Sequence, residues 1–293
     1  MKIFDGKQCV TALKANLKQK IEELPENKRK PKLAALLVGD LAASQLYVKN
    51  KVKTCEEIGM ISEVIRAEEN ISHNDLLEII YRLNSDETVD GYIVQLPLPK
   101  QIDESKILLA IDPKKDVDGF HPHNLGLMLL GLETFVPATP KGIMSILKSE
   151  KIKTAGAHCV VIGRSNIVGT PMALLLSRKG IDCTVTLVHS QTKNIKEFCA
   201  SADILIAAIG KANFVTADMV KDGAVVIDVG INRIDDPSTP KGYRVVGDVD
   251  FEHVKEKASF ITPVPGGVGM LTVISLIENT WMSFCRTENI ANG

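Results

Sequence analysis

The sequence predicts a two-domain α/β protein, and three observations support that prediction. With 293 residues, the chain exceeds the usual size of a single domain. Hydrophobic residues make up 45% of it and charged residues 24%, which is the balance of an ordinary globular protein. Stretches of helical periodicity alternate with short runs rich in β-branched residues, which is the pattern of βα units around a largely parallel sheet.

The charge balance and the apolar runs argue against several classes of protein. Lysine and arginine (35) almost equal aspartate and glutamate (36), so the chain offers no bulk electrostatic attraction to nucleic acid or to an anionic membrane. The opening residues do not form the apolar run of a secretory signal, and we expect no other stretch to be long enough to cross a bilayer. A cytoplasmic protein is therefore expected.

The cysteines and histidines do not suggest a metal site. Six of each are scattered along the chain, without a CxxC pair or the spacing of metal ligands. We interpret the cysteines as buried small hydrophobic residues in a reducing compartment. His121 and His123 stand beside Pro122, which suits a loop.

Helices and strands alternate in the first half. Helices are predicted over residues 7–22, 42–58, 72–83 and 103–110, and strands over residues 33–38, 61–67 and 91–95. Gly59 should end the second helix, because glycine readily adopts the backbone conformation of a helix C-terminus. Pro97 and Pro99 should end the third strand, because proline cannot donate to a sheet. Residues 112–119 are rich in turn formers and predict an exposed loop.

A second series of βα units follows a junction at residues 137–140. Helices are predicted over residues 141–149 and from about residue 170, and strands over residues 158–163, 183–189, 203–210, 224–230 and 258–262. The last helix, ending near Arg286, is expected to pack back on the first domain. The predicted domains are residues 1–140, residues 141–265, and a glycine-rich loop with the final helix over residues 266–293.

A phosphate-binding turn is predicted at the start of the second domain. The buried strand 158–163 opens directly into Gly163-Arg164-Ser165-Asn166-Ile167-Val168-Gly169. Thr170 is expected to cap the next helix and Pro171 to take its first position. Free amide hydrogens and the positive end of a helix dipole both favour an anion, so a dinucleotide pyrophosphate is expected here and the domain should be Rossmann-like. Serine replaces the second glycine of the common pattern, but the surrounding strand and helix support the interpretation.

The cofactor is predicted to be NADP rather than NAD. An NAD site usually carries an acidic residue at the end of the second strand, to hold the ribose hydroxyls. Here that strand ends at His189-Ser190 without a carboxylate, so Arg164 and Ser190 could bind a 2′-phosphate. The strand 224–230 leads into Ile231, and its carboxyl end is expected to border the nicotinamide.

Candidate reacting groups lie in the first domain. Tyr47 and Lys51 are four residues apart, which puts them on one face of the helix 42–58. That face flanks an apolar stripe of Leu41, Val48, Val52 and Cys55. A lysine beside an apolar stripe is often a snorkelling side chain, and this alternative stays open on spacing alone.

Two further polar residues favour a site. Gln95 ends a strand in an apolar run, at the carboxyl edge where α/β sheets bind ligands. Asp118 lies in a glycine-flanked loop that could bring a carboxylate to the same place. Turn stabilisation is the alternative for Asp118, and it fits Asp116 equally well.

Taken together, these motifs carry a resemblance over essentially the whole chain. The matching segments are Val38-Gly39 through Ala43-Ser44, Tyr47-Val48-Lys49-Asn50-Lys51, Val94-Gln95-Leu96-Pro97-Leu98, Lys115-Asp116-Val117-Asp118-Gly119, Thr139-Pro140-Lys141-Gly142, Gly163-Arg164-Ser165 with Val168-Gly169-Thr170-Pro171, and Pro263-Val264-Pro265-Gly266-Gly267-Val268-Gly269. The chain resembles the bifunctional methylenetetrahydrofolate dehydrogenase/methenyltetrahydrofolate cyclohydrolase family.

The resemblance implies roles for single residues. Lys51 would be the central catalytic group and general base, Gln95 its hydrogen-bonding partner, Tyr47 an aromatic plate on the folate and Asp118 the anchor of its pterin. The implied substrate contacts also include Val94, Leu96, Pro265, Gly266 and Gly267. The implied cofactor contacts are Gly163, Arg164, Ser165, Val168, Gly169, Ser190 and Ile231. The resemblance further implies NADP, a homodimer, no metal, and a place in one-carbon folate metabolism and purine biosynthesis.

Two rival functions are kept. A shikimate-type dehydrogenase also pairs a catalytic lysine with a two-domain NADP fold, but it would act on an alcohol. A non-catalytic NADP-sensing module would bind the nucleotide and folate without forming either product.

Overall fold

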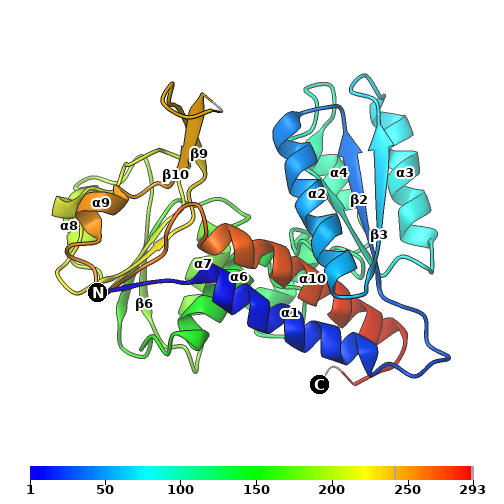
Figure 1. Cartoon of the computed structure of the whole chain (residues 1–293), viewed down its shortest axis with the longest axis horizontal. Coiled ribbons are helices and arrows are strands. Elements are labelled where there is room, and N and C mark those ends of the chain that lie inside the picture. Colours follow the sequence, from blue (N-terminus) through cyan, green and yellow to red (C-terminus); the bar gives the residue numbers. More distant parts are fainter. Residues whose placement is uncertain (241, 292–293) are drawn as a thin grey trace. The chain divides into compact units, whose positions relative to one another are not determined.

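The computed structural model describes residues 1–240 and 242–291, and these form two compact units (Figure 1). The three-stranded unit comprises residues 11–138 and the C-terminal segment from residue 273. The six-stranded unit comprises residues 1–10 and 139–272. The expected α/β class with parallel sheets is confirmed in both.

The three-stranded unit is built on a parallel sheet with the order β3-β2-β4. Its strands are β2 (Lys32–Val38), β3 (Ile61–Ala67) and β4 (Gly91–Val94), and its helices around the sheet are α2 (Ala42–Glu57), α3 (His73–Ser85) and α4 (Glu104–Ala110). Because side chains alternate along a strand, Ala34, Leu36 and Val38 of β2 share one face, where they form a core with α3 and α4. Figure 1 shows α2 on one side of the sheet and α3 on the other.

These elements follow from local sequence signals. Ser72 caps α3, because its hydroxyl accepts the amide hydrogen of Asp75 at 3.1 Å. Gly59 lies two residues beyond α2 with a φ of 84°, as expected of a helix-ending glycine. One part of the predicted apolar stripe is wrong: Leu41 precedes the first turn of α2, and 54% of it is exposed. Val48 and Cys55 are buried as expected.

A short helix replaces part of an expected loop. Helix α5 (Pro122–Leu129) begins directly after His121, whose ring nitrogen Nδ1 accepts the amide hydrogen of His123 at 3.1 Å. Pro122 takes the first helical position, where its missing N–H costs nothing. The turn formers before His121 hide this start signal in the sequence, so a loop was expected at Pro122.

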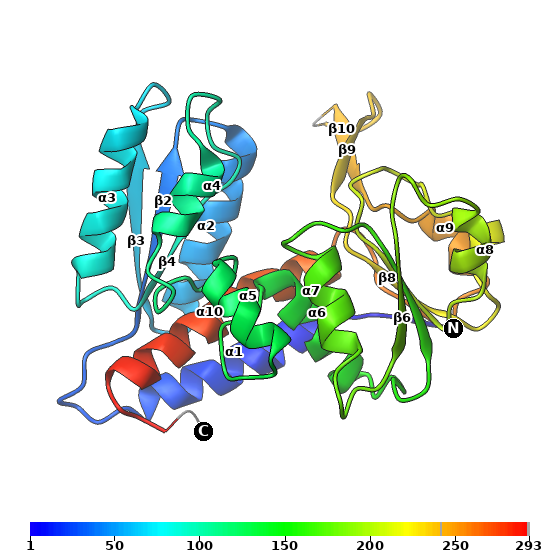
Figure 2. The ribbon, with the colours of Figure 1, turned by 180° about the vertical axis from the view of Figure 1, so that it is seen from behind.

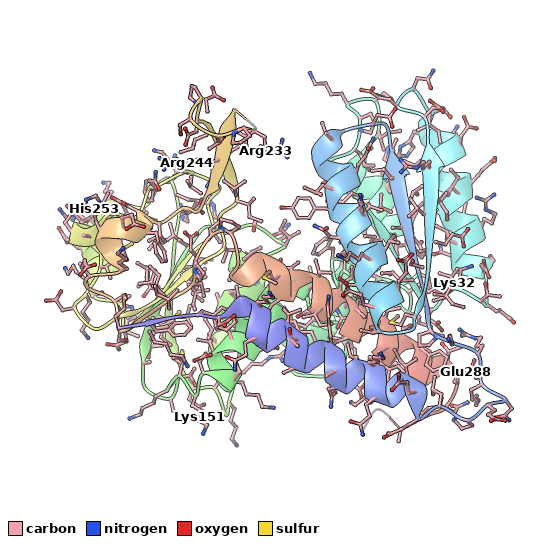
Figure 3. All side chains as sticks on the ribbon, in the orientation of Figure 1. Lys32, Lys151, Arg233, Arg244, His253 and Glu288 are labelled. Atoms are coloured by element: carbon pink, nitrogen blue, oxygen red, sulfur yellow. The ribbon has the colours of Figure 1, made fainter. Side chains whose placement is uncertain are left out.

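The C-terminal helix α10 (Val268–Thr287) corrects another expectation. By length and composition it could cross a membrane, with a mean hydropathy of 1.3, although the sequence analysis expected no such stretch. However, 67% of it is buried inside the protein, as in a core helix. Figure 3 labels Glu288, the residue that directly follows this helix. Within the three-stranded unit, Glu288 pairs with Lys28 at 2.8 Å and Arg29 at 3.0 Å, which fixes the end of the helix. The predicted return of the last helix to the first domain is confirmed.

The six-stranded unit has a parallel sheet with the order β1-β11-β8-β7-β5-β6. Its strands are β1 (Lys2–Ile3), β5 (His158–Ile162), β6 (Thr184–Val188), β7 (Ile204–Ala207), β8 (Val225–Asp228) and β11 (Phe260–Ile261). Its larger helices are α6 (Ala138–Ser149) and α7 (Gly169–Leu176). A core of mainly valine and alanine side chains covers one face of the sheet, and the alternate strand residues, such as Val161 and Ile206, are buried on the other face. Strands buried on both faces read as continuous apolar runs, which is why the sequence located them.

The N-terminal residues lie in the six-stranded unit, although the sequence analysis assigned them to the first domain. Lys2 and Ile3 pair with Phe260 and Ile261, adding an edge strand that is too short for periodicity to detect. Helix α1 (Gly6–Glu22) then leads from this unit into the other. The boundary in the middle of the chain falls after Ala138, inside α6, where a junction was expected.

Several small elements of the six-stranded unit were not anticipated. They are α8 (Ile195–Ala200), the 3-10 helix η1 (Ala217–Met219), the strands β9 (Asn232–Asp235) and β10 (Tyr243–Val246), and α9 (Phe251–Val254). Strands β9 and β10 form an antiparallel hairpin that projects beyond β8 (Figure 2). In it, the Arg233 guanidinium stacks on the Tyr243 ring at 4.8 Å.

Candidate functional site

The candidate reacting groups gather at the carboxyl edge of the three-stranded sheet. Strand β3, which follows β2 in the chain, pairs with one edge of β2, and β4 then pairs with the other edge. This reversal makes a topological switch point between β2 and β4, where open α/β sheets bind their ligands. Gln95 directly follows β4, and its backbone N–H donates to the Leu36 carbonyl at 2.9 Å.

Lys51 of α2 meets Gln95 at this edge. The Lys51 Nζ donates to the Gln95 Oε1 at 3.2 Å, and the Gln95 Nε2 donates to the Leu96 carbonyl at 2.8 Å. The amide is therefore oriented so that its oxygen faces the amine. Such a contact is more specific than the snorkelling alternative, in which the ammonium group would extend into water.

Asp118 and Lys51 influence each other electrostatically. Burial lowers the pKa of the Lys51 amine, and the negative charge of Asp118 partly offsets that effect. Burial raises the pKa of the Asp118 carboxyl, and the positive charge of Lys51 opposes that rise. Both groups are thus shifted toward their neutral forms by desolvation, which makes Lys51 a better proton acceptor near neutral pH than a solvated lysine.

The loop that carries Asp118 is held from within by Asp116. The buried Asp116 carboxylate accepts the amide hydrogens of Phe120 at 3.3 Å and His121 at 2.8 Å, and a side-chain hydrogen of Asn124 at 2.9 Å. Burial raises the pKa of Asp116 to about 6. Turn stabilisation, which the sequence left open for both aspartates, therefore describes Asp116.

Helix α10 fixes the same loop from the other side. The Asn279 side chain donates to the Val117 carbonyl at 2.8 Å and to the Val136 carbonyl at 2.9 Å. The Ser283 hydroxyl, at 2.6 Å from the Asp90 carbonyl and 3.0 Å from the Lys114 carbonyl, joins the loop to the start of β4. Sequence reasoning missed both residues. Two polar side chains in the apolar run of a long helix were the available signal, because buried polar groups need partners.

The other substrate-contact candidates differ in exposure. Tyr47, one turn before Lys51 on α2, is 38% exposed. Leu96 is half-buried next to Gln95. Val94 is buried in the sheet core, so only its backbone is available to a ligand.

A second switch point lies in the six-stranded unit, between β5 and β7. Helix α7 links β5 to β6 on one side of β5, whereas β7 pairs with the other side. The turn after β5 is tightly packed: a Cβ on Gly163 would lie 2.2 Å from the Ala208 carbonyl oxygen, and one on Gly169 would lie 2.0 Å from the Gly163 oxygen. Gly163 also has a φ of 115°. Both positions therefore require glycine.

The start of α7 differs from the expected cap. The helix begins at Gly169, and the Ser165 Oγ accepts hydrogen bonds from the backbone N–H groups of Val168 at 3.2 Å and Gly169 at 3.4 Å. The Thr170 hydroxyl instead donates to the Arg164 carbonyl at 3.3 Å. The expectation that Thr170 caps the helix is therefore wrong, because the glycine at the first position lets the turn close one residue earlier.

The remaining cofactor candidates are exposed on the same unit. Arg164 and Ser190 follow β5 and β6, at the carboxyl edge of the sheet, and both side chains are exposed. Ile231 follows β8 and is 49% exposed. Pro265 is exposed, Gly266 half-buried and Gly267 buried in the loop before α10.

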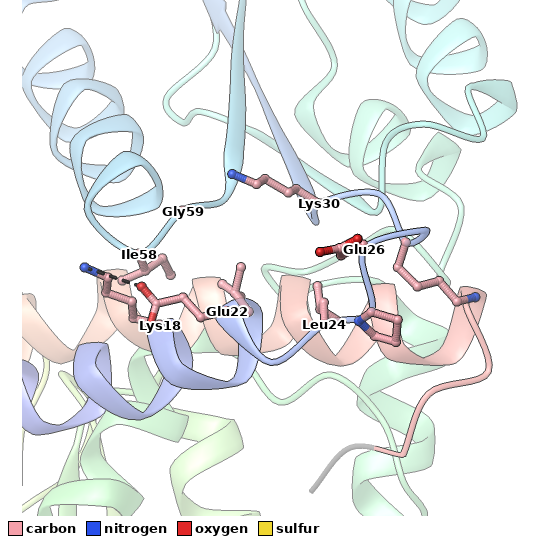
Figure 4. A pocket seen from close by; sticks show the side chains of 10 residues that line it. Lys18, Glu22, Leu24, Glu26, Lys30, Ile58 and Gly59 are labelled. Carbon is pink, nitrogen blue, oxygen red and sulfur yellow. Dashed lines mark ion pairs between the residues drawn. The ribbon is translucent and has the colours of Figure 1, made fainter.

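One other feature offers a weaker site. A cavity of about 340 Å³ in the three-stranded unit, lined by Lys18, Glu22, Glu26, Lys30, Ile58 and others, mixes both charges and includes none of the candidate residues (Figure 4). Its Lys18 and Glu22 pair with each other at 3.7 Å. Over residues 1–240 and 242–291, no group of three or more His, Cys, Asp or Glu side chains is placed to hold a metal ion.

Two family models match the chain. Residues 4–118 match the catalytic domain of tetrahydrofolate dehydrogenase/cyclohydrolase, and residues 137–288 match the NAD(P)-binding domain of the same enzyme. The first match includes Lys51, Gln95 and Asp118, and the second includes the turn 163–169.

Curated relatives match over nearly the full chain. The bifunctional protein FolD of Pelodictyon phaeoclathratiforme is 57% identical, covering 99% of this chain and 100% of the relative. The bifunctional protein FolD of Porphyromonas gingivalis is 53% identical over 96% of each.

Solved structures of enzymes of this kind also match over nearly the full chain. The FolD methylenetetrahydrofolate dehydrogenase/cyclohydrolase of Campylobacter jejuni has a TM-score of 0.92 and 47% identity, covering 98% of this chain and 99% of that chain. The Trypanosoma brucei enzyme, complexed with NADP cofactor and inhibitor, has a TM-score of 0.93 and 36% identity, covering 98% of both. A shikimate dehydrogenase of Aquifex aeolicus shares the fold alone. It has a TM-score of 0.52 and 12% identity, covering 88% of this chain and 97% of that chain.

Proposed function

The chain belongs to the tetrahydrofolate dehydrogenase/cyclohydrolase family, and from this premise we propose how its residues perform the two reactions of that family. The enzyme oxidises 5,10-methylenetetrahydrofolate to 5,10-methenyltetrahydrofolate with NADP, and hydrolyses that product to 10-formyltetrahydrofolate. The observation that carries the assignment of residues is the contact of Lys51 with Gln95 at 3.2 Å, within the electrostatic influence of Asp118.

The oxidation needs little acid–base help from the protein. The substrate carries its one-carbon unit between two nitrogens, so loss of a hydride leaves a cation that both nitrogens delocalise. No hydroxyl proton has to be removed, and the main task of the protein is to hold the reacting carbon in position. In the three-stranded unit, Tyr47 covers the folate ring and the Asp118 carboxylate accepts two N–H bonds from the pterin edge.

The hydrolysis does need a base. Water that attacks the methenyl carbon must lose a proton, and the desolvated Lys51 amine accepts it at Nζ. The bond between that carbon and N5 then breaks, N5 takes up a proton, and the formyl group stays on N10. Gln95 holds the amine through its Oε1 and is itself fixed by the Leu96 carbonyl. Transient charge on Lys51 is compensated by Asp118, whose loop is held by Asp116 and Asn279.

The six-stranded unit fits a dinucleotide. The turn 163–169 lies at the start of α7, where the positive end of the helix dipole favours an anion, and its two glycines let the backbone pass close to the carbonyls of Ala208 and Gly163. Arg164 and Ser190 would hold the 2′-phosphate, Gly163, Ser165, Val168 and Gly169 the pyrophosphate region, and Ile231 the nicotinamide end. When bound, NADP accepts the hydride. Pro265, Gly266 and Gly267 are assigned to the substrate with Val94 and Leu96.

The wider setting is part of the same proposal. We assign folate binding to the three-stranded unit, which holds most of the predicted domain 1–140 together with the final helix from residue 273, and NADP binding to the six-stranded unit, which holds the predicted domain 141–265. The enzyme acts as a homodimer in the cytoplasm, supplies one-carbon units for purine biosynthesis, and uses neither a metal nor a nucleic-acid or membrane partner. The near-zero net charge and the family membership support these statements.

The test is a pair of spectrophotometric assays. Purified protein with methylenetetrahydrofolate and NADP should produce NADPH, and with methenyltetrahydrofolate alone it should consume that cation faster than buffer does. Lys51→Met should abolish the second reaction. The matched control is Lys53→Met on the same helix, because Lys53 is 71% exposed and should leave both rates unchanged. Turnover of shikimate but not folate, or binding of both ligands without either product, would favour a rival function instead.

A further inference from the structure

Two buried carboxylates lie at the carboxyl edge of the six-stranded sheet, and the mechanism above does not use them. Asp228 is the last residue of β8 and is 2% exposed, whereas Asp248 follows β10 and is fully buried. Burying carboxylates costs free energy unless hydrogen bonds satisfy them. Their hydrogen-bond donors therefore indicate what the two groups hold in place.

Asp248 joins two loops. Its Oδ2 accepts the amide hydrogens of Ile209 at 2.7 Å and Gly210 at 2.9 Å, and its Oδ1 accepts that of Lys211 at 2.8 Å. Oδ1 also accepts a side-chain hydrogen of Asn232 at 2.9 Å. One carboxylate thus fixes the loop after β7, which borders the switch point, to the first residue of β9.

Asp228 holds the turn between β8 and β9 from its other end. Its Oδ1 accepts the amide hydrogens of Gly230 and Asp248, both at 2.9 Å, and its Oδ2 accepts that of Val249 at 3.0 Å. Gly230 and Asn232, the two neighbours of Ile231, are therefore each fixed by one of the two carboxylates.

The backbone is packed directly against both groups. A Cβ on Gly230 would lie 2.3 Å from the Asp248 Oδ1, and a Cβ on Gly247 would lie 1.8 Å from the Asp228 Oδ2. Any other residue at these positions would displace the carboxylates, so the arrangement has little freedom to adjust.

What this rigid turn presents is an exposed apolar side chain. Ile231 is 49% exposed although both of its neighbours are anchored to buried groups. An exposed isoleucine on a mobile loop would need no explanation. An exposed isoleucine held by two desolvated carboxylates, beside the loop of the switch point, is placed to contact a ligand.

We propose that Asp248, together with Asp228, is a positioning residue for hydride transfer: it fixes Ile231 and the loop 209–211 so that the nicotinamide ring is held in one orientation. This inference rests on the proposed function, in which Ile231 contacts that end of NADP. Such a device acts on orientation more than on affinity, because the 2′-phosphate and pyrophosphate contacts lie elsewhere in the unit.

The experiment is Asp248→Asn in the full-length enzyme, with both reactions measured on the same preparation. The amide keeps the size of the side chain but turns one acceptor oxygen into a donor facing N–H groups. We expect the dehydrogenase kcat to fall by about tenfold or more while the KM for NADP changes less than about threefold. Hydrolysis of methenyltetrahydrofolate without nucleotide should be unchanged, since Lys51, Gln95 and Asp118 belong to the other unit.

The matched control is Asp203→Asn. Asp203 also accepts a backbone amide hydrogen, that of His158 at 2.9 Å, but at the amino end of β5. It should leave kcat and KM unchanged. If Asp248→Asn does not fold, Asn232→Ala removes one of the same contacts without altering the carboxylate, and a smaller fall in kcat is expected.

A double-mutant cycle tests whether Asp248 acts through Ile231. Ile231→Ala should itself lower kcat, and in that background Asp248→Asn should cost clearly less than it does alone. Additive effects, an unchanged kcat, or a parallel loss of both reactions would overturn the inference. Failure of the proposed function would look different, since the unmodified enzyme would then show neither reaction.

Discussion

Replacing Asn279 of α10 by leucine should weaken both the fold and folate binding. The side chain is fully buried and donates to the carbonyls of Val117 and Val136 at 2.8 and 2.9 Å. Each neutral hydrogen bond contributes about 1 kcal/mol, and a buried carbonyl left without its donor costs about 1–3 kcal/mol. Leucine has the same branched shape and number of heavy atoms, so the free energy of unfolding should fall by about 2–4 kcal/mol, mainly through loss of the polar contacts.

The functional consequence follows from the position of Val117. It directly precedes Asp118, so a shift of this carbonyl moves the carboxylate to which we assign the pterin. We expect the KM for methenyltetrahydrofolate to rise by about tenfold, with a smaller change in kcat. Urea denaturation and initial rates of the cyclohydrolase measure the two effects.

The neighbouring residue provides the control. Thr280 is equally buried, but its hydroxyl donates to the Leu276 carbonyl of the same helix at 3.1 Å. Thr280→Val should therefore cost less than about 1 kcal/mol and leave the KM unchanged. If Asn279→Leu behaves like Thr280→Val in both measurements, α10 does not hold the loop and this reasoning is refuted.

Three further predictions concern charge. Arg164→Ala should raise the KM for NADP by about tenfold or more and that for NAD far less, and equal losses in steady-state kinetics would place the 2′-phosphate elsewhere. Because burial lowers the pKa of Lys51, the hydrolysis rate should rise with pH as the amine loses its proton, and a flat pH–rate profile would contradict this. For the same reason, Lys51→Met should raise the free energy of unfolding at pH 7 by about 1 kcal/mol, and a destabilised variant would contradict that expectation. Burial raises the pKa of Asp116 to about 6, so the native state binds this proton more tightly than the unfolded chain does. The resulting contribution to the free energy of unfolding is fully present below the ordinary pKa near 4, and it is lost as the pH rises to about 6. Relative to Asp116→Asn, the unmodified protein should lose about 2–3 kcal/mol across that window in urea titrations, and parallel pH profiles of the two proteins would refute the assignment.

The site shows which residues could be found from the sequence. Lys51 and Tyr47 were accessible because a helix places residues four apart on one face, and Gln95 because a polar residue ended an apolar strand. Ser165 and Thr170 were harder to assign, since which hydroxyl meets the first amides of α7 depends on how tightly Gly163 and Gly169 let the turn close.

The residues that position the site could not be assigned in this way. Asn279 and Ser283 lie more than 140 residues from their partners Val117, Val136 and Lys114. The same holds for β1, whose two residues pair with Phe260 and Ile261 at the far end of the chain. No local periodicity reports such partners, because hydrogen bonds to backbone carbonyls leave no complementary residue type to recognise.

The sequence by itself determined the parallel α/β class, and it predicted two ligand edges and the side chains that face them, because strand burial, helix faces and glycine turns are local properties. Only the tertiary structure decided that Lys51 meets Gln95 within the field of Asp118, that α10 holds the Asp118 loop, and that Asp228 and Asp248 fix the turn at Ile231. Those arrangements depend on desolvation and on contacts between segments distant along the chain, and both arise only when the core has formed.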